Sequence, residues 1–404
     1  MNTTPQRIAF KVNAKAERMI RKEHPWVFDQ AIVKQSKAGA AGDLAIIYDQ
    51  KSNKLLAIGL YDPYSPIRIK VLQFKQSAVI NDEWFGAKIE AAFAQRQPLF
   101  QTDTNSYRLI YGENDGLPAL IVDVYADVLV IKLYSTIWLP YLEKITALLM
   151  AVGQAKTVVL RLSRNVQKLK TDYQDGQILA GELEDENVIF REHGLRFVAN
   201  VLKGHKTGYF LDHRHNRKRV GELAKGKRVL DVFSYAGGFS VHALAGGATS
   251  VLSVDISAQA LELAKKNVRL NELEAKHETL AKDAFEAMKA LANARQKFDL
   301  IIIDPPAFAK RESEVAGAIH SYKRLVKAIL PLLAPNAILL MASCSSRVKA
   351  DVFFEAVLEV IRSSGRSSQE LERTFHDVDH PIGFAEGAYL KSVYLVFFLI
   401  TTSN

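Results

Sequence analysis

The sequence predicts an α/β fold in the C-terminal half of the chain, with a doubly wound, mostly parallel sheet, preceded by a β-rich domain and an α+β connector. From about residue 201 onward, apolar strand-like runs alternate with amphipathic segments, a pattern typical of parallel sheets. The first 75 residues instead contain short strands separated by polar turns. Because 404 residues exceed what one core usually accommodates, we expect three domains, at 1–75, 76–200 and 201–404.

The expected elements follow in chain order. In the first domain, strands are predicted over 43–48 and 55–61. In the second, the sequence predicts a helix over 81–97, strands over 119–124 and 128–134, and a helix over 139–152. The third should contain strands over 228–233, 250–255, 298–304 and 337–342, and antiparallel strands near 370–375 and 392–399. Its best-defined helix covers 257–271, with Ser257 as the expected N-cap.

Composition and charge limit the functions to be considered. The formal charge of +9 and the pI near 9.3 favour a polyanionic partner. A single cysteine excludes an intrachain disulfide, and residues 1–8 lack the apolar segment of a signal peptide, so we expect a cytoplasmic protein. No apolar run approaches the 18 residues of a membrane-spanning helix. The histidines show no metal-ligand spacing, so no metal is expected.

Polar residues at successive strand ends indicate a cofactor site. The strand ending near Asp231 leads into a turn with Gly237 and Gly238, which let a ligand approach the backbone. Asp255 follows about 20 residues later, where a carboxylate can hold a ribose, and Asp283 follows the third strand. Either acidic residue could instead be only a helix N-cap. The turn is not Gly-x-Gly-x-x-Gly, so pyrophosphate binding is not specifically indicated.

Two further strand ends carry groups suited to covalent chemistry. Asp304 begins an Asp-Pro-Pro-Ala-Phe sequence, and Cys344, the single cysteine, follows another apolar strand. A lone cysteine is more often a small buried hydrophobe, and Asp-Pro-Pro can be merely a rigid turn. Beside the predicted cofactor site, however, the two residues suit covalent chemistry. A thiolate can add to a pyrimidine ring and activate the neighbouring carbon, and Asp304 can serve as an acid or hydrogen-bond partner at the ring nitrogen.

The strand-end pattern resembles the S-adenosylmethionine site of class I methyltransferases, whose doubly wound sheet has seven strands. More narrowly, the chain resembles bacterial large-subunit (23S) ribosomal RNA methyltransferases that form 5-methylcytidine and carry an N-terminal PUA domain. The resemblance rests on residues 24–28, 58–67, 111–118 and 204–214. It implies S-adenosylmethionine as cofactor, an unpaired cytidine of ribosomal RNA as substrate, and a capacity to form homodimers. The residues that it implies for the cofactor are Lys206, Tyr209, Asp231, Phe233, Tyr235, Gly237, Gly238, Asp255, Asp283 and Asp304, and the catalytic residues are Cys344 and Asp304.

One position departs from related RNA cytosine-5 methyltransferases. Many of them carry a second cysteine after Asp-Pro-Pro, where this chain has Ala307, so attack is assigned to Cys344 and the base that releases the product stays open among His320, Lys310 and water. The basic segment 206–219 either contacts phosphate or is a solvated surface. Phe308 and Tyr235 either stack on an extruded base or belong to the core.

Two other functions compete with this interpretation. The first is an RNA methyltransferase on the same fold that modifies guanine or a ring nitrogen. The second is a non-catalytic RNA-binding protein of ribosome assembly, which would not bind S-adenosylmethionine. Retention of Asp231, Asp255, Asp283 and Asp304 together argues against the second.

Overall fold

The computed structural model describes residues 4–398, and its backbone contacts divide the chain into two units. The first unit contains the residues up to 192 together with 199–211 and 378–387. The second contains 193–198, 212–377 and the residues from 388 onward. Among the described residues, no helix is both long and apolar enough to cross a membrane.

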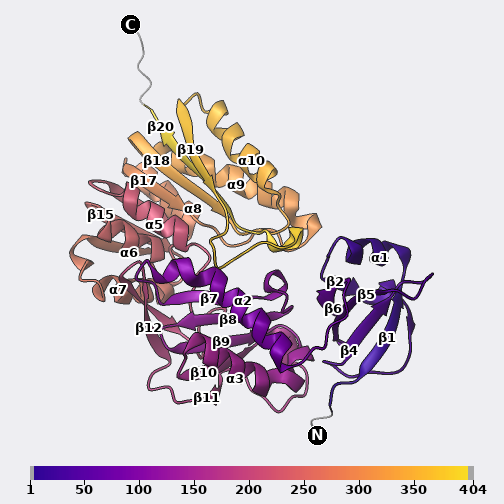
Figure 1. Ribbon diagram of the computed structural model, residues 1–404. Coiled ribbons are helices and arrows are strands. Elements are labelled where there is room, and N and C mark those ends of the chain that lie inside the picture. Colours follow the sequence, from indigo (N-terminus) through magenta and orange to yellow (C-terminus); the bar gives the residue numbers. More distant parts are fainter. Residues whose placement is uncertain (1–3, 399–404) are drawn as a thin grey trace. The chain divides into compact units, whose positions relative to one another are not determined.

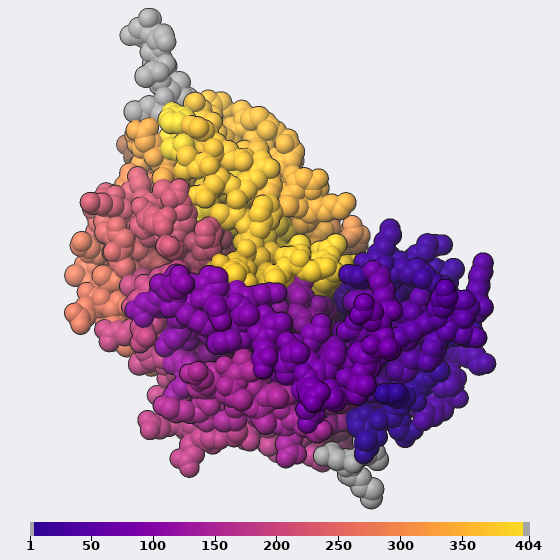
Figure 2. Space-filling model, in the orientation of Figure 1, coloured from indigo at the N-terminus to yellow at the C-terminus, as the bar shows by residue number. Residues whose placement is uncertain are grey.

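The first unit begins with a six-stranded β-rich domain, whose residues are indigo in Figures 1 and 2. Its strands lie in the order β2-β6-β5-β4-β1-β3, and its core contains Ile8, Phe10 and Ile69. The elements are β1 (Arg7–Val12), α1 (Ala14–Arg21), β2 (Trp26–Phe28), β3 (Ile32–Gln35), β4 (Leu44–Tyr48), β5 (Leu55–Tyr61) and β6 (Ile67–Phe74). Both strands predicted here are therefore present, as β4 and β5.

A second sheet of the first unit has the order β11-β10-β9-β8-β7. Two buried ion pairs lie in this region: Arg96 with Asp115 at 2.6 Å and Arg108 with Asp123 at 2.8 Å. The elements are α2 (Asp82–Phe100), β7 (Ser106–Tyr111), β8 (Leu120–Tyr125), β9 (Val128–Leu133), α3 (Leu142–Gly153), β10 (Thr157–Leu162), α4 (Arg164–Gln167) and β11 (Gln177–Ala180). The predicted helix over 139–152 begins instead as a 3-10 turn, Thr136–Tyr141, because Pro140 lies there and lacks an amide donor.

The second unit contains a seven-stranded sheet in the order β16-β15-β14-β17-β18-β20-β19. The first five strands of this order, β16, β15, β14, β17 and β18, pair in parallel, whereas β20 pairs antiparallel with β18 and β19. Helices α5, α6 and α7 form one group and α8, α9 and α10 another, so that helices cover both faces (Figure 1). The doubly wound, mostly parallel fold predicted from the sequence is confirmed.

The bounds in this part of the chain agree closely with prediction. Strands β12 (Asn187–Glu192) and β13 (Leu195–Asn200) precede α5 (Arg214–Leu223), β14 (Arg228–Val232), α6 (Gly238–Ala245), β15 (Ser250–Asp255), α7 (Ala258–Arg269), β16 (His277–Ala281), α8 (Ala284–Asn293), β17 (Phe298–Ile303), α9 (Val315–Ile329), β18 (Leu333–Ser343), α10 (Ala350–Ser363), β19 (Ser368–Thr374) and β20 (Lys391–Phe397). Strand β18 is longer than predicted. The predicted end of the last strand, Leu399, lies outside the described residues.

Candidate active site

Two neighbouring parallel strands carry Asp304 and Cys344 at the same end of the sheet. Strands β17 and β18 pair with Ile303 opposite Met341, and Asp304 and Cys344 come directly after these strands. Because carboxyl ends of parallel strands meet at one edge of a sheet, the two side chains are brought together as predicted. Both residues are partly exposed.

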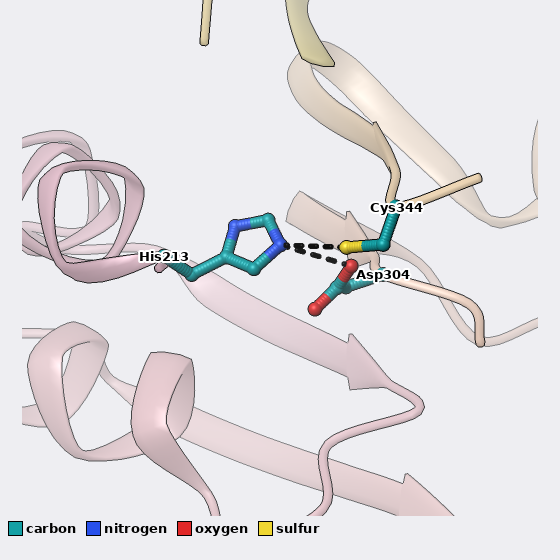
Figure 3. A group of neighbouring side chains, drawn as sticks. All are labelled: His213, Asp304 and Cys344. Carbon is teal, nitrogen blue, oxygen red and sulfur yellow. Dashed lines mark hydrogen bonds and ion pairs between the residues drawn. The ribbon is translucent and has the colours of Figure 1, made fainter. Parts of the chain in front are cut away.

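His213 completes the group, and it comes from a different part of the chain. It is the N-cap residue of α5 and is 3% exposed. Its Nε2 atom lies 3.6 Å from Cys344 Sγ and 3.2 Å from Asp304 Oδ1, and Figure 3 shows the ring directed at both groups. The contact with Asp304 lies within ion-pair distance and is an ion pair only when the ring carries two protons, and no well-aligned hydrogen bond reaches Oδ1 among the described residues.

The sequence did not identify His213 as a partner of the thiol. It lies in the basic segment 206–219, for which we considered phosphate contact or a solvated surface. Burial of His213, Arg214 and Arg217 shows that the solvated-surface interpretation is wrong for these three residues. In the sequence, His213 is marked only by its place just before a helix. That position does not specify which strand end the ring faces.

The charges around Cys344 oppose one another. Burial raises the pKa of the Cys344 thiol, the negative charge of Asp304 raises it further, and His213 lowers it. Burial opposes a second proton on His213, while Asp304 and Cys344 favour one and raise the pKa of the ring. The thiol therefore needs a proton acceptor and nearby donors before it can act as a nucleophile.

A buried lysine donates a hydrogen bond to the backbone next to Cys344. Lys391 is 2% exposed, and its ammonium group donates to the carbonyl oxygens of Ser345 at 2.5 Å and Tyr389 at 3.1 Å. Burial lowers the pKa of Lys391 to about 8, while Cys344 acts to raise it. Within residues 4–398 it pairs with no carboxylate. A positive charge left uncompensated next to Cys344 favours the thiolate.

Asp231 is the buried carboxylate of the predicted cofactor site. Its Oδ2 atom accepts a hydrogen bond from Ser240 Oγ at 2.6 Å, and Ser240 lies 2.6 Å from Ser253, which lies 2.7 Å from His277. Oδ1 has no hydrogen-bond partner in the described part of the chain. Burial raises the pKa of Asp231 to about 7, with Asp304 and Asp255 contributing. An orphaned buried carboxylate oxygen of this kind suits a ligand with a cationic group.

The turn at Gly237 has a backbone conformation that favours glycine and leaves no room for a side chain. Gly237 has φ +73° and is the N-cap of α6, and an added Cβ would lie 2.8 Å from Ala264 Cβ. Phe233 and Tyr235 also have positive φ, 64° and 47°. Residues with positive φ persist only where the surrounding structure holds the backbone in place, and they cluster at ligand sites.

The remaining acidic positions have structural partners of their own. Asp255 accepts hydrogen bonds from the backbone of Tyr235 and Ser257, each at 2.9 Å. Asp283 Oδ1 caps α8 by accepting from Phe285 and Glu286. The N-cap interpretation of Asp283 thus describes one of its oxygens. Asp255 ends β15, which pairs with β14, and Asp283 lies just past β16, which pairs with β15, so the polar strand ends do line one edge of the sheet. This edge fits S-adenosylmethionine, with its ammonium, ribose and adenine groups.

Other predicted residues have different surroundings. Lys206 and Tyr209 belong to the first unit, where the Lys206 ammonium lies 4.2 Å from the Phe210 ring and Tyr209 is buried against Phe190. Phe308 packs on Tyr322 with ring centroids 5.2 Å apart, and it is partly buried. Tyr235 is also partly buried.

Both side chains considered as the releasing base are exposed. His320 lies on α9, and Lys310 lies in the loop before that helix. The roles of these two residues and of those predicted to bind cofactor stay predictions.

The three side chains also have the composition of a metal site, because one ligand atom from each of His213, Asp304 and Cys344 lies within 4.8 Å of the others. A divalent ion of the zinc type accepts such a set when the imidazole nitrogen offers a lone pair. If Nε2 carries a proton, it can donate to the thiolate of Cys344; if it does not, its lone pair can bind a metal ion.

Comparisons with known proteins show the family of the chain. A family model described as an S-adenosylmethionine-dependent methyltransferase matches residues 108–388, and one described as a PUA-like domain matches residues 10–74. The chain is 46% identical to a ribosomal RNA large subunit methyltransferase of Deinococcus radiodurans, covering 96% of this chain and 97% of the relative. It is 36% identical to ribosomal RNA large subunit methyltransferase I of Tolumonas auensis, covering 93% and 96%.

Solved structures confirm the fold. One is assigned as a methyltransferase and complexed with SAH; it superimposes with a TM-score of 0.82 at 21% identity, covering 97% of this chain and all of the other. A SAM-dependent methyltransferase assigned in Streptococcus mutans gives a TM-score of 0.80 at 20% identity, covering 96% and 99%.

Proposed function

The chain belongs to the S-adenosylmethionine-dependent methyltransferase family that includes the ribosomal RNA large subunit methyltransferases, and from this premise we propose that it forms 5-methylcytidine in large-subunit ribosomal RNA. The observation that carries the proposal is the placement of the thiol of a partly exposed cysteine beside a carboxylate and an imidazole at the carboxyl ends of the parallel strands. A nitrogen atom can attack a methyl donor directly, whereas a pyrimidine carbon needs covalent activation. The RNA substrate is proposed from the names of the relatives.

The first step is attack by Cys344. Its thiol proton passes to the Asp304 carboxylate, and the thiolate sulfur forms a bond to C6 of cytosine. Asp304 then donates this proton to N3 of the ring, so that the electron pair of the C5–C6 bond becomes available at C5. Asp304 thereby acts in turn as base and acid. His213 Nε2 stabilises the negative charge on sulfur at the start of the step.

S-adenosylmethionine would supply an electrophilic methyl group to C5, and its methyl–sulfur bond would break to leave S-adenosylhomocysteine. The residues proposed to hold this cofactor are Asp231 at its ammonium group, Asp255 at its ribose and Asp283 at its adenine. The turn at Gly237 and Gly238 would let the cofactor approach the backbone. The proton on C5 next leaves to a base, the sulfur–C6 bond breaks to restore the aromatic ring, and the proton on N3 returns through Asp304 to the sulfur, which restores the thiol.

The domain organisation is proposed to serve this reaction. The domains 1–75, 76–200 and 201–404 would act as a PUA-like RNA-binding domain, a connector and a catalytic domain. The target cytidine must be unpaired or extruded before Cys344 can reach C6. The net positive charge of +9 favours binding to the RNA backbone.

The test is product identification. The protein is incubated with S-adenosylmethionine and unmodified large-subunit ribosomal RNA, which is then digested and analysed for methylated nucleosides by mass spectrometry. We expect 5-methylcytidine from the wild type and none from C344A, while C344A retains binding of S-adenosylhomocysteine. A methylated guanosine or adenosine, or equal product from C344A, would refute the covalent mechanism and favour the nitrogen-methylating alternative.

A further inference from the structure

A buried asparagine contacts the side of the His213 ring that faces away from Cys344. Asn216 is 1% exposed, and its Nδ2 atom lies 3.1 Å from His213 Nδ1. A neutral imidazole carries one proton, so the role of Nδ1 determines the role of Nε2. The group bound at Nδ1 therefore decides whether Nε2 presents a proton or a lone pair to the thiol.

Hydrogen bonds fix the orientation of the Asn216 amide. Thr374 Oγ1 donates to Asn216 Oδ1 at 2.6 Å, and the Tyr394 hydroxyl lies 3.2 Å from the same atom. A separation of 2.6 Å is typical of an O–H donor to oxygen and short for an amide N–H donor. The oxygen of the amide thus faces Thr374, and Nδ2 donates to His213 Nδ1 and to Ser392 Oγ at 3.2 Å.

This arrangement makes Nδ1 of His213 an acceptor. The proton of the neutral ring is then on Nε2, which lies 3.6 Å from Cys344 Sγ and 3.2 Å from Asp304 Oδ1. A second proton, which Asp304 and Cys344 favour, would set an N–H of the ring against an N–H of Asn216. An Nε2 atom that already bears a proton can donate to a thiolate but cannot accept the proton of a thiol.

We propose that Asn216 is a positioning residue that holds His213 as a neutral hydrogen-bond donor to the Cys344 thiolate, and not as its base. The same arrangement disfavours a metal ion at His213, Asp304 and Cys344, because Nε2 offers no lone pair. The catalytic consequence rests on the proposed function, since it matters only if Cys344 is a nucleophile. The tautomer itself, and the ionisation of the thiol, can be measured without RNA or cofactor.

The test replaces Asn216 by aspartate, which has nearly the same shape. In N216D the new carboxylate can accept from Thr374, Tyr394 and Ser392 and also from a proton on His213 Nδ1, so every polar atom keeps a partner. His213 should then hold two protons, and the cationic ring should lower the pKa of the Cys344 thiol by about one unit. A purely structural role for Asn216 gives no reason for a more acidic thiol.

Thiol ionisation is followed by the rate of alkylation with iodoacetamide between pH 6 and 10. The readout is specific because Cys344 is the single cysteine. We expect N216D to react about ten-fold faster than the wild type at pH 7, by the one-unit shift. The other charges facing this group, Asp304, Asp212 and Lys391, are the same in both proteins. N293D, which makes the same change at the exposed end of α8, should match the wild type.

Nitrogen-15 NMR of labelled histidine gives a second measurement that needs no variant to fold. The wild-type His213 signals should show a proton on Nε2 and none on Nδ1 at pH 7. A proton on Nδ1, or an equal or slower alkylation rate in folded N216D, would overturn the proposal. If both measurements agree with it but no 5-methylcytidine forms, then the proposed function fails and the assignment of Asn216 stands.

Discussion

Binding of S-adenosylhomocysteine should depend on pH through one residue, Asp231. Burial and the neighbouring charges of Asp304 and Asp255 raise the pKa of this carboxyl to about 7, so it is half protonated near neutral pH in the free protein. The ammonium group of the ligand prefers the charged carboxylate. The apparent affinity then scales with the charged fraction, which is about 0.9 at pH 8 and about 0.1 at pH 6. We expect affinity at pH 6 to be about ten-fold weaker than at pH 8.

Calorimetric titration at pH 6, 7 and 8 tests this expectation. D231N should bind more weakly and lose the dependence. S240A removes the hydrogen bond that Ser240 donates to Asp231 at 2.6 Å, which favours the charged form, so the midpoint should move up by about one to two pH units. His277, whose pKa burial lowers to about 4, does not titrate in this range. A flat wild-type profile, or an unchanged profile in D231N, would refute the reasoning.

The contribution of Asp231 to folding stability changes with pH in the opposite direction to ligand affinity: it falls as the pH rises. A carboxyl with a raised pKa in the folded state binds its proton more tightly there than in the unfolded chain. The free protein should therefore lose stability from Asp231 as the pH rises from about 4 through about 7. Bound S-adenosylhomocysteine should reduce this loss, because it favours the charged form; thermal unfolding with and without ligand measures the difference.

Three further predictions follow from the same region. Removing the buried ammonium in K391M should raise the pKa of the Cys344 thiol and slow its alkylation at pH 7 by about ten-fold, whereas the exposed change K289M should not; equal rates would show that Lys391 does not act on the thiol. N216D should bind Zn²⁺ about 10–100-fold more tightly than the wild type in a calorimetric titration, because a carboxylate at Nδ1 keeps a proton on that nitrogen while Zn²⁺ displaces the proton of Nε2 and binds its lone pair. G237A should lower stability by about 1–3 kcal/mol, because φ is +73° and its Cβ would contact α7; an unchanged melting temperature would contradict this.

Local sequence patterns predicted most of the catalytic domain. Strands β14, β15 and β17 and helix α7 have the expected positions within a few residues, because apolar runs and a Ser257 cap specify them locally. The strand-end residues Asp304 and Cys344 could also be predicted as neighbours. Parallel strands that carry polar residues at their carboxyl ends bring those residues to one edge whatever the details of packing.

The chemistry around the thiol depended on tertiary structure. His213 precedes Cys344 by 131 residues, and Lys391 follows Cys344 by 47, so no local pattern connects them. Asn216 lies one turn after His213, yet its effect depends on Thr374 orienting its amide. The sequence by itself determined the fold class through periodicity, indicated the family through the resemblance of its motifs, and predicted Cys344 as the nucleophile from its place at a strand end. Only the tertiary structure decided which groups hold protons beside the thiol, because burial and hydrogen-bond direction arise when distant segments pack together.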